Sequence, residues 1–215
     1  MNVWNKCLVA VTIIVLALPI SAEELKPIKL QPPQLEKGKI LMQALKERKS
    51  SRSFSSKKLP LDVLSNLLWA ACGVNRPESG KKTAPSAVNW QEIDVYMADQ
   101  QGLFFYDAKE HSLKPILKKD IRALAGKQNF VAEAPVNLIY VADLSKMGER
   151  SVEEKNFYSA VDTGFISQNV YLYCASEGLS TVVRGAVDRD ALSQIMNLGS
   201  KQRIILVQTV GYPKE

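Results

Sequence analysis

Two arginines and a serine stand close together in the first quarter of the chain, where their chemistry would suit a phosphate group. Arg48, Ser50 and Arg52 alternate along one short segment. Arginine presents a rigid fork of N–H donors that matches phosphate oxygens in a bidentate geometry, and a serine hydroxyl adds a further hydrogen bond. The segment therefore predicts an anion-binding site, and a helix end that simply exposes its arginines is the alternative.

Two later segments have the composition of loops that lie close to a ligand. The segment TAPSAVNWQ, residues 83–91, places a proline, small residues and an amide directly before an expected strand, which is typical of a loop beside a planar ligand. The segment VVRGA, residues 182–186, follows an expected strand and contains Gly185, whose flexible backbone allows neighbouring amides to face a ligand. The same segment holds Arg184, a bulky cation.

The sequence lacks the patterns of most other catalytic and binding sites. It contains no GxGxxG, P-loop, GxSxG or HExxH motif and no paired cysteines or histidines. Its one histidine, His111, is expected in an exposed turn, so we expect no metal site. The lysine pairs are scattered, which does not favour nucleic-acid binding. Cys72 and Cys174 stand in apolar helical patterns and are predicted to be buried free thiols, with a disulfide as the alternative.

Length and composition indicate one folded domain behind a targeting segment. The 215 residues are 46% apolar and 23% charged, with a net charge of +6, which excludes a disordered or fibrous chain. Residues 1–22 are predicted to be a signal peptide, because a polar, positive start and an apolar run end at the small residues Ser21 and Ala22. The apolar run is shorter than the roughly 20 residues of a membrane span.

We therefore expect cleavage after Ala22, a secreted or periplasmic protein, and no stable membrane span afterwards. An uncleaved anchor is the alternative. Residues 23–34 are rich in proline and lysine and are predicted to form an extended leader on the surface. Residues 35–215 are predicted to form the domain itself.

Periodicity along residues 35–215 predicts an α+β fold. Helices are expected over residues 35–48, 60–73 and 153–177 and around 192–196. Strands are expected at residues 93–97, 103–106, 113–117, 136–142, 181–183 and 204–210. Gly164 lies inside the longest helix and costs roughly 1 kcal/mol of helix propensity relative to alanine, which predicts close approach by another backbone.

Seven segments, taken in chain order, resemble the nitroreductase family of FMN enzymes, and more closely its branch of SagB-type dehydrogenases. These segments are ERKSSRSF (47–54), LLWAACGVNRP (67–77), TAPSAVNWQEIDVY (83–96), GLFFYDAKEHSLKP (102–115), DTGFISQNVYL (162–172), EGLSTVVRGAVD (177–188) and VGYP (210–213). The resemblance implies a nitroreductase-like α+β fold in which an antiparallel-dominated sheet is flanked by helices. It also implies a homodimer, joined through the long helix, with one FMN in each of two clefts between the subunits.

The resemblance assigns roles to the three polar segments. The phosphate and ribityl chain would be held by Arg48, Ser50 and Arg52. The isoalloxazine would be contacted, usually from the partner subunit, by Pro85, Ser86, Ala87 and Asn89. The backbone amides that would face flavin N5 and O4 are those of Val183, Arg184, Gly185 and Ala186. A donor at N5 stabilises the reduced ring. Family members often end in a basic tail that binds the phosphate, and here Lys214 is the basic residue left for that role.

The implied activity is that of an FMN-dependent oxidoreductase. It would transfer a hydride, two electrons, to or from a small organic substrate such as a nitro or quinone-type compound by a ping-pong scheme. Arg184 would orient an anionic substrate or stabilise the reduced flavin, with a structural ion pair as the alternative, and Arg76 is a second catalytic candidate. The electron donor is NADH, NADPH or an extracytoplasmic redox partner. The alternative functions are a SagB-like dehydrogenase of peptide heterocycles and a catalytically silent flavin- or ligand-binding protein.

Overall fold

A seven-stranded antiparallel sheet forms the centre of the molecule. The computed structural model describes residues 24–214, so the predicted signal peptide lies outside the described residues. The strand order is β1-β6-β5-β4-β7-β9-β8, and every neighbouring pair is antiparallel. The strands are β1 (Ile28–Lys29), β4 (Ile93–Ala98), β5 (Leu103–Asp107), β6 (Ser112–Leu117), β7 (Val136–Asp143), β8 (Ser180–Arg184) and β9 (Gln202–Gly211). A separate hairpin consists of β2 (Val74–Arg76) and β3 (Lys81–Lys82).

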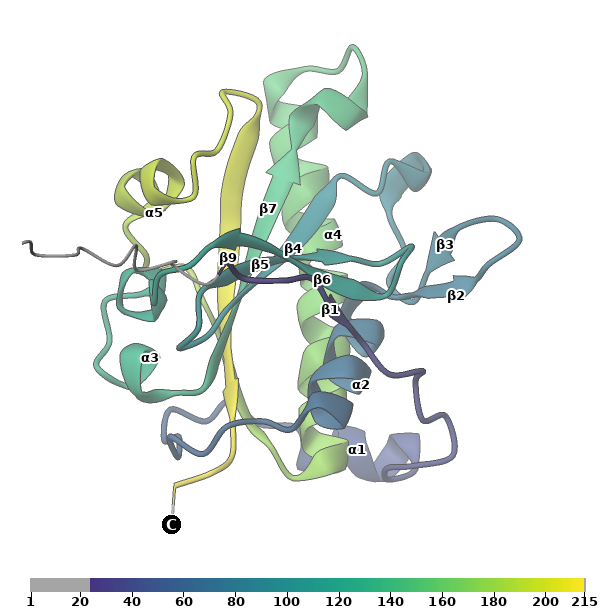
Figure 1. Ribbon diagram of the computed structural model, residues 1–215. Helices are drawn as coiled ribbons and strands as arrows, with labels where there is room; N and C mark the ends of the chain where they lie inside the picture. The colour runs from purple at the N-terminus through teal and green to yellow at the C-terminus, as the bar shows by residue number, and fades with distance from the viewer. Residues whose placement is uncertain (1–23, 215) are drawn as a thin grey trace, which may run out of the picture.

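Helices cover both faces of the sheet (Figure 1). They are α1 (Leu41–Glu47), α2 (Leu61–Cys72), α3 (Phe130–Glu133), α4 (Val152–Glu177) and α5 (Arg189–Ile195), with short 3-10 turns at Ala87–Asn89, Arg122–Ala125 and Leu144–Met147. One face of the sheet packs on α2 and α4, and the other packs on α5 and the Arg122–Ala125 turn. Strand β7 is buried on both faces, as its apolar sequence predicts. The expected α+β fold with an antiparallel sheet is confirmed.

The long helix α4 begins and ends where its sequence predicts. Ser151 and Glu154 form a reciprocal capping box at its start, and Gly178 ends it in the left-handed conformation at φ 70°. The predicted close approach at Gly164 is wrong for the single chain. Among the described residues, no atom lies within 4 Å of where a Cβ at Gly164 would stand. Gly164 instead lies on an exposed strip of α4.

The first helix is shorter than predicted, and its apolar side chains face outward. It begins at Leu41 rather than at residue 35, and Ala44 is its buried residue. Leu41 is 63% exposed, and Met42 is 72% exposed. The reason is that α1 lies against the end of α4 and not against the sheet, so only one small side chain is covered within this chain. Periodicity located the apolar face correctly but could not say what covers it.

Residues 24–34, most of the predicted leader, contain one short strand, and this strand joins the sheet. Ile28 and Lys29 pair with β6, and Leu30 is only 3% exposed. Burial of Leu30 therefore anchors the leader to the sheet edge. Cys72 and Cys174 are buried and free, as predicted. No helix within residues 24–214 combines the length and apolarity that crossing a membrane requires.

Candidate cofactor site

A tyrosine on α4 joins the first and third predicted segments. The hydroxyl of Tyr171 lies 2.8 Å from Ser50 Oγ and accepts the backbone N–H of Val183 at 3.0 Å. The backbone of Ser51 also donates to the carbonyl of Thr181 on β8. The structure thus brings together two segments that are more than a hundred residues apart in sequence. The Val183 amide is bonded to Tyr171, and the exposed residues of this segment are Gly185 and Ala186.

A cavity of about 770 Å³ lies beside this junction. Arg48 and Lys214 both line it, so the structure brings the first predicted cation to the C-terminal one. The guanidinium of Arg48 lies 5.4 Å from the centre of the Tyr171 ring. One acid lines the cavity, Glu47, and its carboxylate is paired with Lys39. The hydrogen bonds from Lys39 and Gln43 lower the pKa of Glu47. Four basic residues line the cavity, Lys46, Arg48, Lys49 and Lys214, so its lining carries an excess of cations.

Only part of the predicted phosphate set faces this cavity. Ser51 and Ser53 line it, whereas Ser50 and Arg52 do not. One backbone hydrogen bond, from Ser51 to Thr181, joins the segment to β8, and neighbouring side chains of an extended segment point to opposite sides. Ser50 therefore points toward Tyr171, and Arg52 is exposed.

The second predicted segment forms a tight turn at a different place on α4. The backbone N–H of Ala87 donates to Asp162 Oδ2 at 2.9 Å, and Ser86 Oγ accepts the N–H of Gln91 at 2.8 Å. Asp162 and Tyr171 are nine positions apart on α4, which corresponds to about 13 Å along the helix. Within one chain the turn is thus separated from the Ser50–Tyr171–Val183 junction.

The turn is conformationally strained. Three residues without the freedom of glycine have positive φ: Val88 at 51°, Asn89 at 57° and Gln91 at 50°. A β-branched residue such as Val88 is a rare occupant of that region. Strain of this kind persists only where the surroundings hold the backbone, and it is common at ligand sites.

Arg184 lies in a buried polar network away from this junction. It is 7% exposed, and its guanidinium donates to the carbonyl of Ala125 at 3.0 Å, to Asn137 Oδ1 at 3.1 Å and to Thr209 Oγ1 at 2.8 Å. Burial lowers the pKa of Arg184 to about 10. A Cβ at Gly126 would overlap the guanidinium, so a larger residue there would displace the Arg184 side chain.

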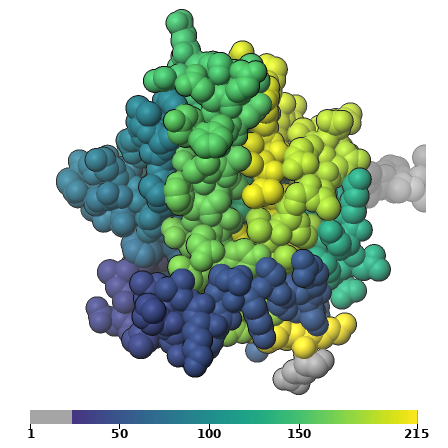
Figure 2. All heavy atoms as spheres, turned by 180° about the vertical axis from the view of Figure 1, so that it is seen from behind, coloured from purple at the N-terminus to yellow at the C-terminus, as the bar shows by residue number. Residues whose placement is uncertain are grey.

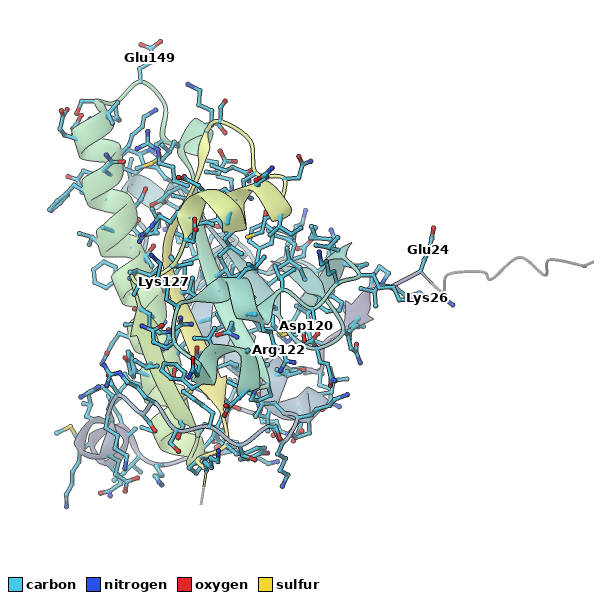
Figure 3. The ribbon with its side chains drawn as sticks, turned by 90° about the vertical axis from the view of Figure 1, so that its left-hand side faces the viewer. Glu24, Lys26, Asp120, Arg122, Lys127 and Glu149 are labelled. Atoms are coloured by element: carbon cyan, nitrogen blue, oxygen red, sulfur yellow. The ribbon has the colours of Figure 1, made fainter. Side chains whose placement is uncertain are left out.

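Neither sequence-based interpretation of the Arg184 side chain describes this environment. No carboxylate pairs with Arg184 among residues 24–214, so it does not form the structural ion pair that was the alternative. Its two terminal N atoms donate to neutral acceptors inside the protein, whereas its Nε is buried without a hydrogen-bond partner among the described residues. The terminal N atoms therefore point into the protein interior. By contrast, Arg122 on the same side of the molecule pairs with Asp120 at 2.7 Å (Figure 3).

Arg76 lies beside the strained turn on the β2–β3 hairpin. Its side chain donates to the carbonyl of Lys82 at 2.7 Å and to Asn75 Oδ1 at 3.0 Å. It borders a hollow of about 200 Å³ whose other lining residues are Lys81, Lys82, Ala84, Pro85, Ser86, Asn89 and Gln91. None of these residues is acidic, so the hollow beside the turn is cationic.

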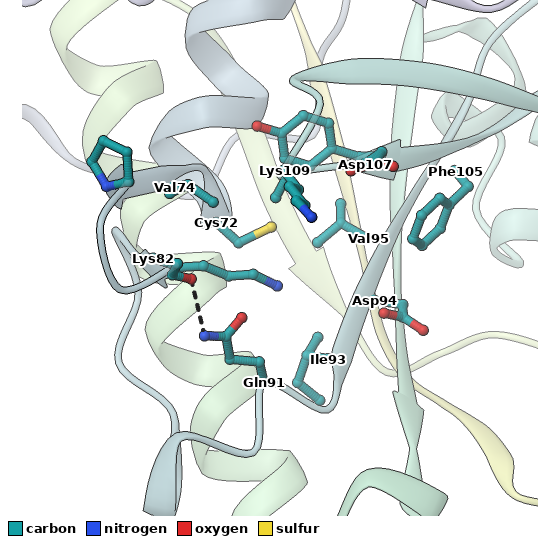
Figure 4. Close-up of a pocket in the computed structure, with 14 residues that line it drawn as sticks. Cys72, Val74, Lys82, Gln91, Ile93, Asp94, Val95, Phe105, Asp107 and Lys109 are labelled. Atoms are coloured by element: carbon teal, nitrogen blue, oxygen red, sulfur yellow. Dashed lines mark hydrogen bonds between the residues drawn. The ribbon is translucent and has the colours of Figure 1, made fainter.

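A second hollow, of about 490 Å³, lies between the hairpin and the sheet (Figure 4). Lys82 and Gln91 line both hollows, and Asp94 stands on the opposite wall, paired with Lys146 at 2.7 Å. Cys72 also lines this hollow. Burial raises the pKa of Cys72 to about 11, so its thiol is protonated and poorly nucleophilic.

Comparisons with known proteins decide the family. Residues 45–212 match the model of the nitroreductase family. The chain belongs to the nitroreductase family. A Methanocaldococcus jannaschii protein provisionally named a nitroreductase, MJ1384, is 34% identical over 194 residues, which are 85% of this chain and 96% of the relative. The fold and the oxidoreductase family implied by the sequence are therefore confirmed.

Solved structures show the same fold. A protein from Ralstonia eutropha JMP134, described provisionally as a nitroreductase, has a TM-score of 0.84 and 42% identity, covering 88% of this chain and 90% of its own. A chain of the Escherichia coli microcin synthetase McbBCD complex has a TM-score of 0.68 at 19% identity, covering 94% of this chain and 85% of its own. At that identity the second likeness is one of fold alone.

Sequence reasoning missed three residues that organise the site. Tyr171 and Asp162 lie within the segment DTGFISQNVYL. Glu92, which accepts a hydrogen bond from Ser86 Oγ in the turn, lies within TAPSAVNWQEIDVY. None of the three was selected as a functional residue. A signal was present for Asp162. It falls on the buried side of a long amphipathic helix, where a carboxylate is costly unless it has a specific partner.

Proposed function

We propose that the protein is an FMN-dependent oxidoreductase that transfers a hydride to or from a small organic substrate, of nitro or quinone type, by a ping-pong scheme. One observation carries this proposal. In a member of the nitroreductase family, the Ser50–Tyr171–Val183 junction places the first and third polar segments side by side, next to a cation-lined cavity. FMN, when bound, supplies the hydride chemistry, and the protein supplies position and electrostatics.

The residues around the cavity fit the phosphate end of FMN. Arg48 and Lys214 supply positive charge, and Ser51 and Ser53 supply hydroxyl groups on the same wall. A phosphate carries close to two negative charges and accepts several hydrogen bonds, so this donor set matches it. We assign Arg48 the larger role and Arg52 a smaller one, because the side chain of Arg52 is exposed and does not line the cavity.

The isoalloxazine end would lie against the exposed Gly185 and Ala186 amides of one subunit and the turn at Pro85, Ser86, Ala87 and Asn89 of the other. Within one chain the two α4 residues that bond to these segments, Asp162 and Tyr171, lie about 13 Å apart along the helix. A second copy of the chain would bring its own turn to the junction. Backbone amides held in place before the reaction stabilise charge that develops on the ring without a cost of reorganisation.

A homodimer would also cover the apolar residues that this chain leaves exposed. Phe157 is 63% exposed and Phe165 is 44% exposed on α4, and Gly164 lies beside them on the same strip. Helix α1, which carries the exposed apolar residues Leu41 and Met42, lies across the lower end of α4 on this face (Figure 2). Isologous contact across this face would bury both groups, as in other symmetric dimers.

The cationic hollow around Arg76 would favour a substrate that carries a negative charge. It adjoins the turn that we assign to the flavin ring, and its lining residues carry no acid. Arg184 cannot serve this purpose from its buried network, so the role proposed for it passes to Arg76. For the compartment, we propose export directed by residues 1–22, with an extracytoplasmic redox partner as the electron donor.

The test is reconstitution of the mature chain with FMN, followed by removal of free flavin, an absorbance spectrum and light scattering. The expected result is a dimer that retains close to one FMN per chain. A protein that retains no flavin contradicts the cofactor, and a monomer that retains stoichiometric FMN contradicts the shared cleft. Retention of an FMN that no donor can reduce would favour a catalytically silent flavoprotein. Oxidation of a heterocycle-containing peptide would favour a SagB-like dehydrogenase.

A further inference from the structure

Two buried carboxylates lie directly behind the strained turn. Glu92, just before β4, is 0% exposed, and Asp162, in the middle of α4, is 2% exposed. Neither forms an ion pair among residues 24–214. Two ionised carboxylates in contact inside a protein would repel each other and would also lose their hydration. Their burial together therefore needs a physical explanation.

One buried oxygen of the pair has no hydrogen-bond donor among residues 24–214. Ser86 Oγ donates to Glu92 Oε2 at 3.2 Å, and Ala87 N–H donates to Asp162 Oδ2 at 2.9 Å. Glu92 Oε1 is buried and has no hydrogen-bond donor among the described residues. Burial and the facing carboxylate of Asp162 raise the pKa of Glu92 above its ordinary value of 4.5. A proton on Oε1 would turn this oxygen into a donor to Asp162, so neither carboxylate oxygen of Glu92 would lack a partner.

The same pair fixes the turn that the proposed function assigns to the flavin ring. The carboxylate of Glu92 accepts a hydrogen bond from the hydroxyl of Ser86, and this hydroxyl in turn accepts the backbone N–H of Gln91. Asp162 holds the backbone of Ala87. The strained residues Val88 and Asn89 lie between Ala87, which Asp162 holds, and Gln91, which bonds to Ser86. Loss of either attachment would let the turn relax toward ordinary backbone conformations.

We propose that Glu92 and Asp162 share one proton, and that this shared proton locks the Ser86–Gln91 turn in the conformation that receives the flavin ring. The two are positioning residues, because they act through the turn and not on the reacting atoms. The proposal rests on the proposed function for the ligand of the turn. The shared proton itself can be tested without any flavin.

The other charged and titratable groups nearby do not replace this proton. Lys82 of β3 and Cys72 of α2 line the small cavity of about 20 Å³ beside the pair, and burial keeps Cys72 protonated. Asp94 on β4 is paired with Lys146. Asp143, at the end of β7, donates its backbone N–H to the carbonyl of Glu92. None of these four donates a hydrogen bond to either carboxylate of the pair, within the part of the chain that is described.

The sign of the pH dependence follows from the raised pKa. The folded protein holds the proton of Glu92 at pH values where an unfolded chain has lost it, so folding takes up a proton. The stabilising effect is complete below the ordinary glutamate value of 4.5 and is lost as the pH rises through the raised value. If the locked turn is needed for FMN, the dissociation constant of FMN rises over the same range, by at most about tenfold per pH unit.

The first experiment looks for the proton in flavin-free protein by infrared difference spectroscopy. At a pH where exposed glutamates are ionised, the parent should show the C=O stretch of a protonated carboxylic acid. Glu92→Gln should abolish this band, because glutamine keeps the shape and can donate to Asp162. Asp94→Asn is the matched control, with the same chemical change on the neighbouring strand, and it should keep the band. Absence of the band from the parent, or its persistence in Glu92→Gln, overturns the shared proton.

The second experiment measures the dissociation constant of FMN against pH by quenching of flavin fluorescence. The parent and Asp94→Asn should lose affinity with rising pH, whereas Glu92→Gln should be flat. Asp162→Asn gives a second variant: its amide can accept from Ala87 and donate to an ionised Glu92, so both the slope and the band should disappear. An equal slope in the parent and both pair variants overturns the locking role. If the parent does not bind FMN at all, the proposed function fails while the infrared result still decides the shared proton.

Discussion

Replacement of Arg184 by methionine separates a structural role from a catalytic one. The guanidinium donates to the Ala125 carbonyl, to Asn137 and to Thr209. In Arg184→Met, Asn137 Oδ1 keeps its bond from the Thr209 hydroxyl at 2.6 Å, but the carbonyl of Ala125 loses its donor. A buried acceptor without a partner costs about 1 to 3 kcal/mol.

Removal of the charge offsets part of this cost. The pKa of Arg184 is lowered to about 10, which means that burial disfavours the charged form. We therefore expect a net loss of about 2 kcal/mol in the free energy of unfolding, which is roughly 4 to 8 °C in Tm for a chain of this size. FMN affinity and the rate of flavin reduction should stay within about threefold of the parent.

Thermal unfolding, FMN titration and stopped-flow reduction of the same variant form the assay. Arg203→Met is the control, because this exposed arginine bonds only to Asn156 among the described residues and its loss should cost less than about 0.5 kcal/mol. An Arg184→Met protein with an unchanged Tm but a reduction rate lowered tenfold or more would refute the structural assignment. Arg184 would then have to reach the reacting atoms.

Four other predictions follow from the site. Arg48→Ala should raise the dissociation constant of FMN by about 10- to 100-fold in a fluorescence titration, because a charge-assisted bond is worth about 1.5 to 3 kcal/mol. Arg52→Ala should raise this constant by a smaller factor. The reverse order would mean that Arg52 holds the phosphate. Phe165→Glu should give a monomer by light scattering and lose bound FMN, and a dimer that persists would move the interface away from α4. The Cys72 thiol, whose pKa burial raises to about 11, should not react with a disulfide reagent at neutral pH until the protein unfolds, and rapid labelling of the native protein would contradict its burial. Arg76→Ala should raise the KM for an anionic nitro compound at least fivefold more than that for a neutral one, whereas equal changes would remove charge recognition from Arg76.

The elements that were predicted well are those whose residues are buried by the same chain. Helix α2 begins after Pro60 and ends before Gly73, and β7 is an apolar run buried on both faces. In these segments the local pattern and the tertiary environment impose the same requirement, so periodicity is sufficient. Helix α1 is the contrasting case, because its apolar residues face outward and the sequence cannot show which surface covers them.

The site was predicted only in part, because side-chain direction depends on the tertiary structure. The sequence identified Arg48 and Gly185 as parts of a site. It could not show that the side chain of Arg184, the residue before Gly185, points away from the cavity that Arg48 lines and toward Ala125. The Glu92–Asp162 pair was missed for a similar reason. Each carboxylate has an ordinary local sequence, and only the packing of α4 against the start of β4 brings the two together.

The most direct test of the central claim is an anaerobic double-mixing experiment on the FMN-reconstituted protein. The protein is first mixed with a stoichiometric amount of dithionite, which stands in for the unidentified physiological donor. It is then mixed with a nitroaromatic or quinone compound, while flavin absorbance is recorded. We expect full loss of the oxidised flavin band after the first mix and its return after the second. One molecule of two-electron acceptor should be consumed per flavin. A bound flavin that stays reduced in the presence of every such acceptor would contradict the assignment of the protein as an oxidoreductase of this class.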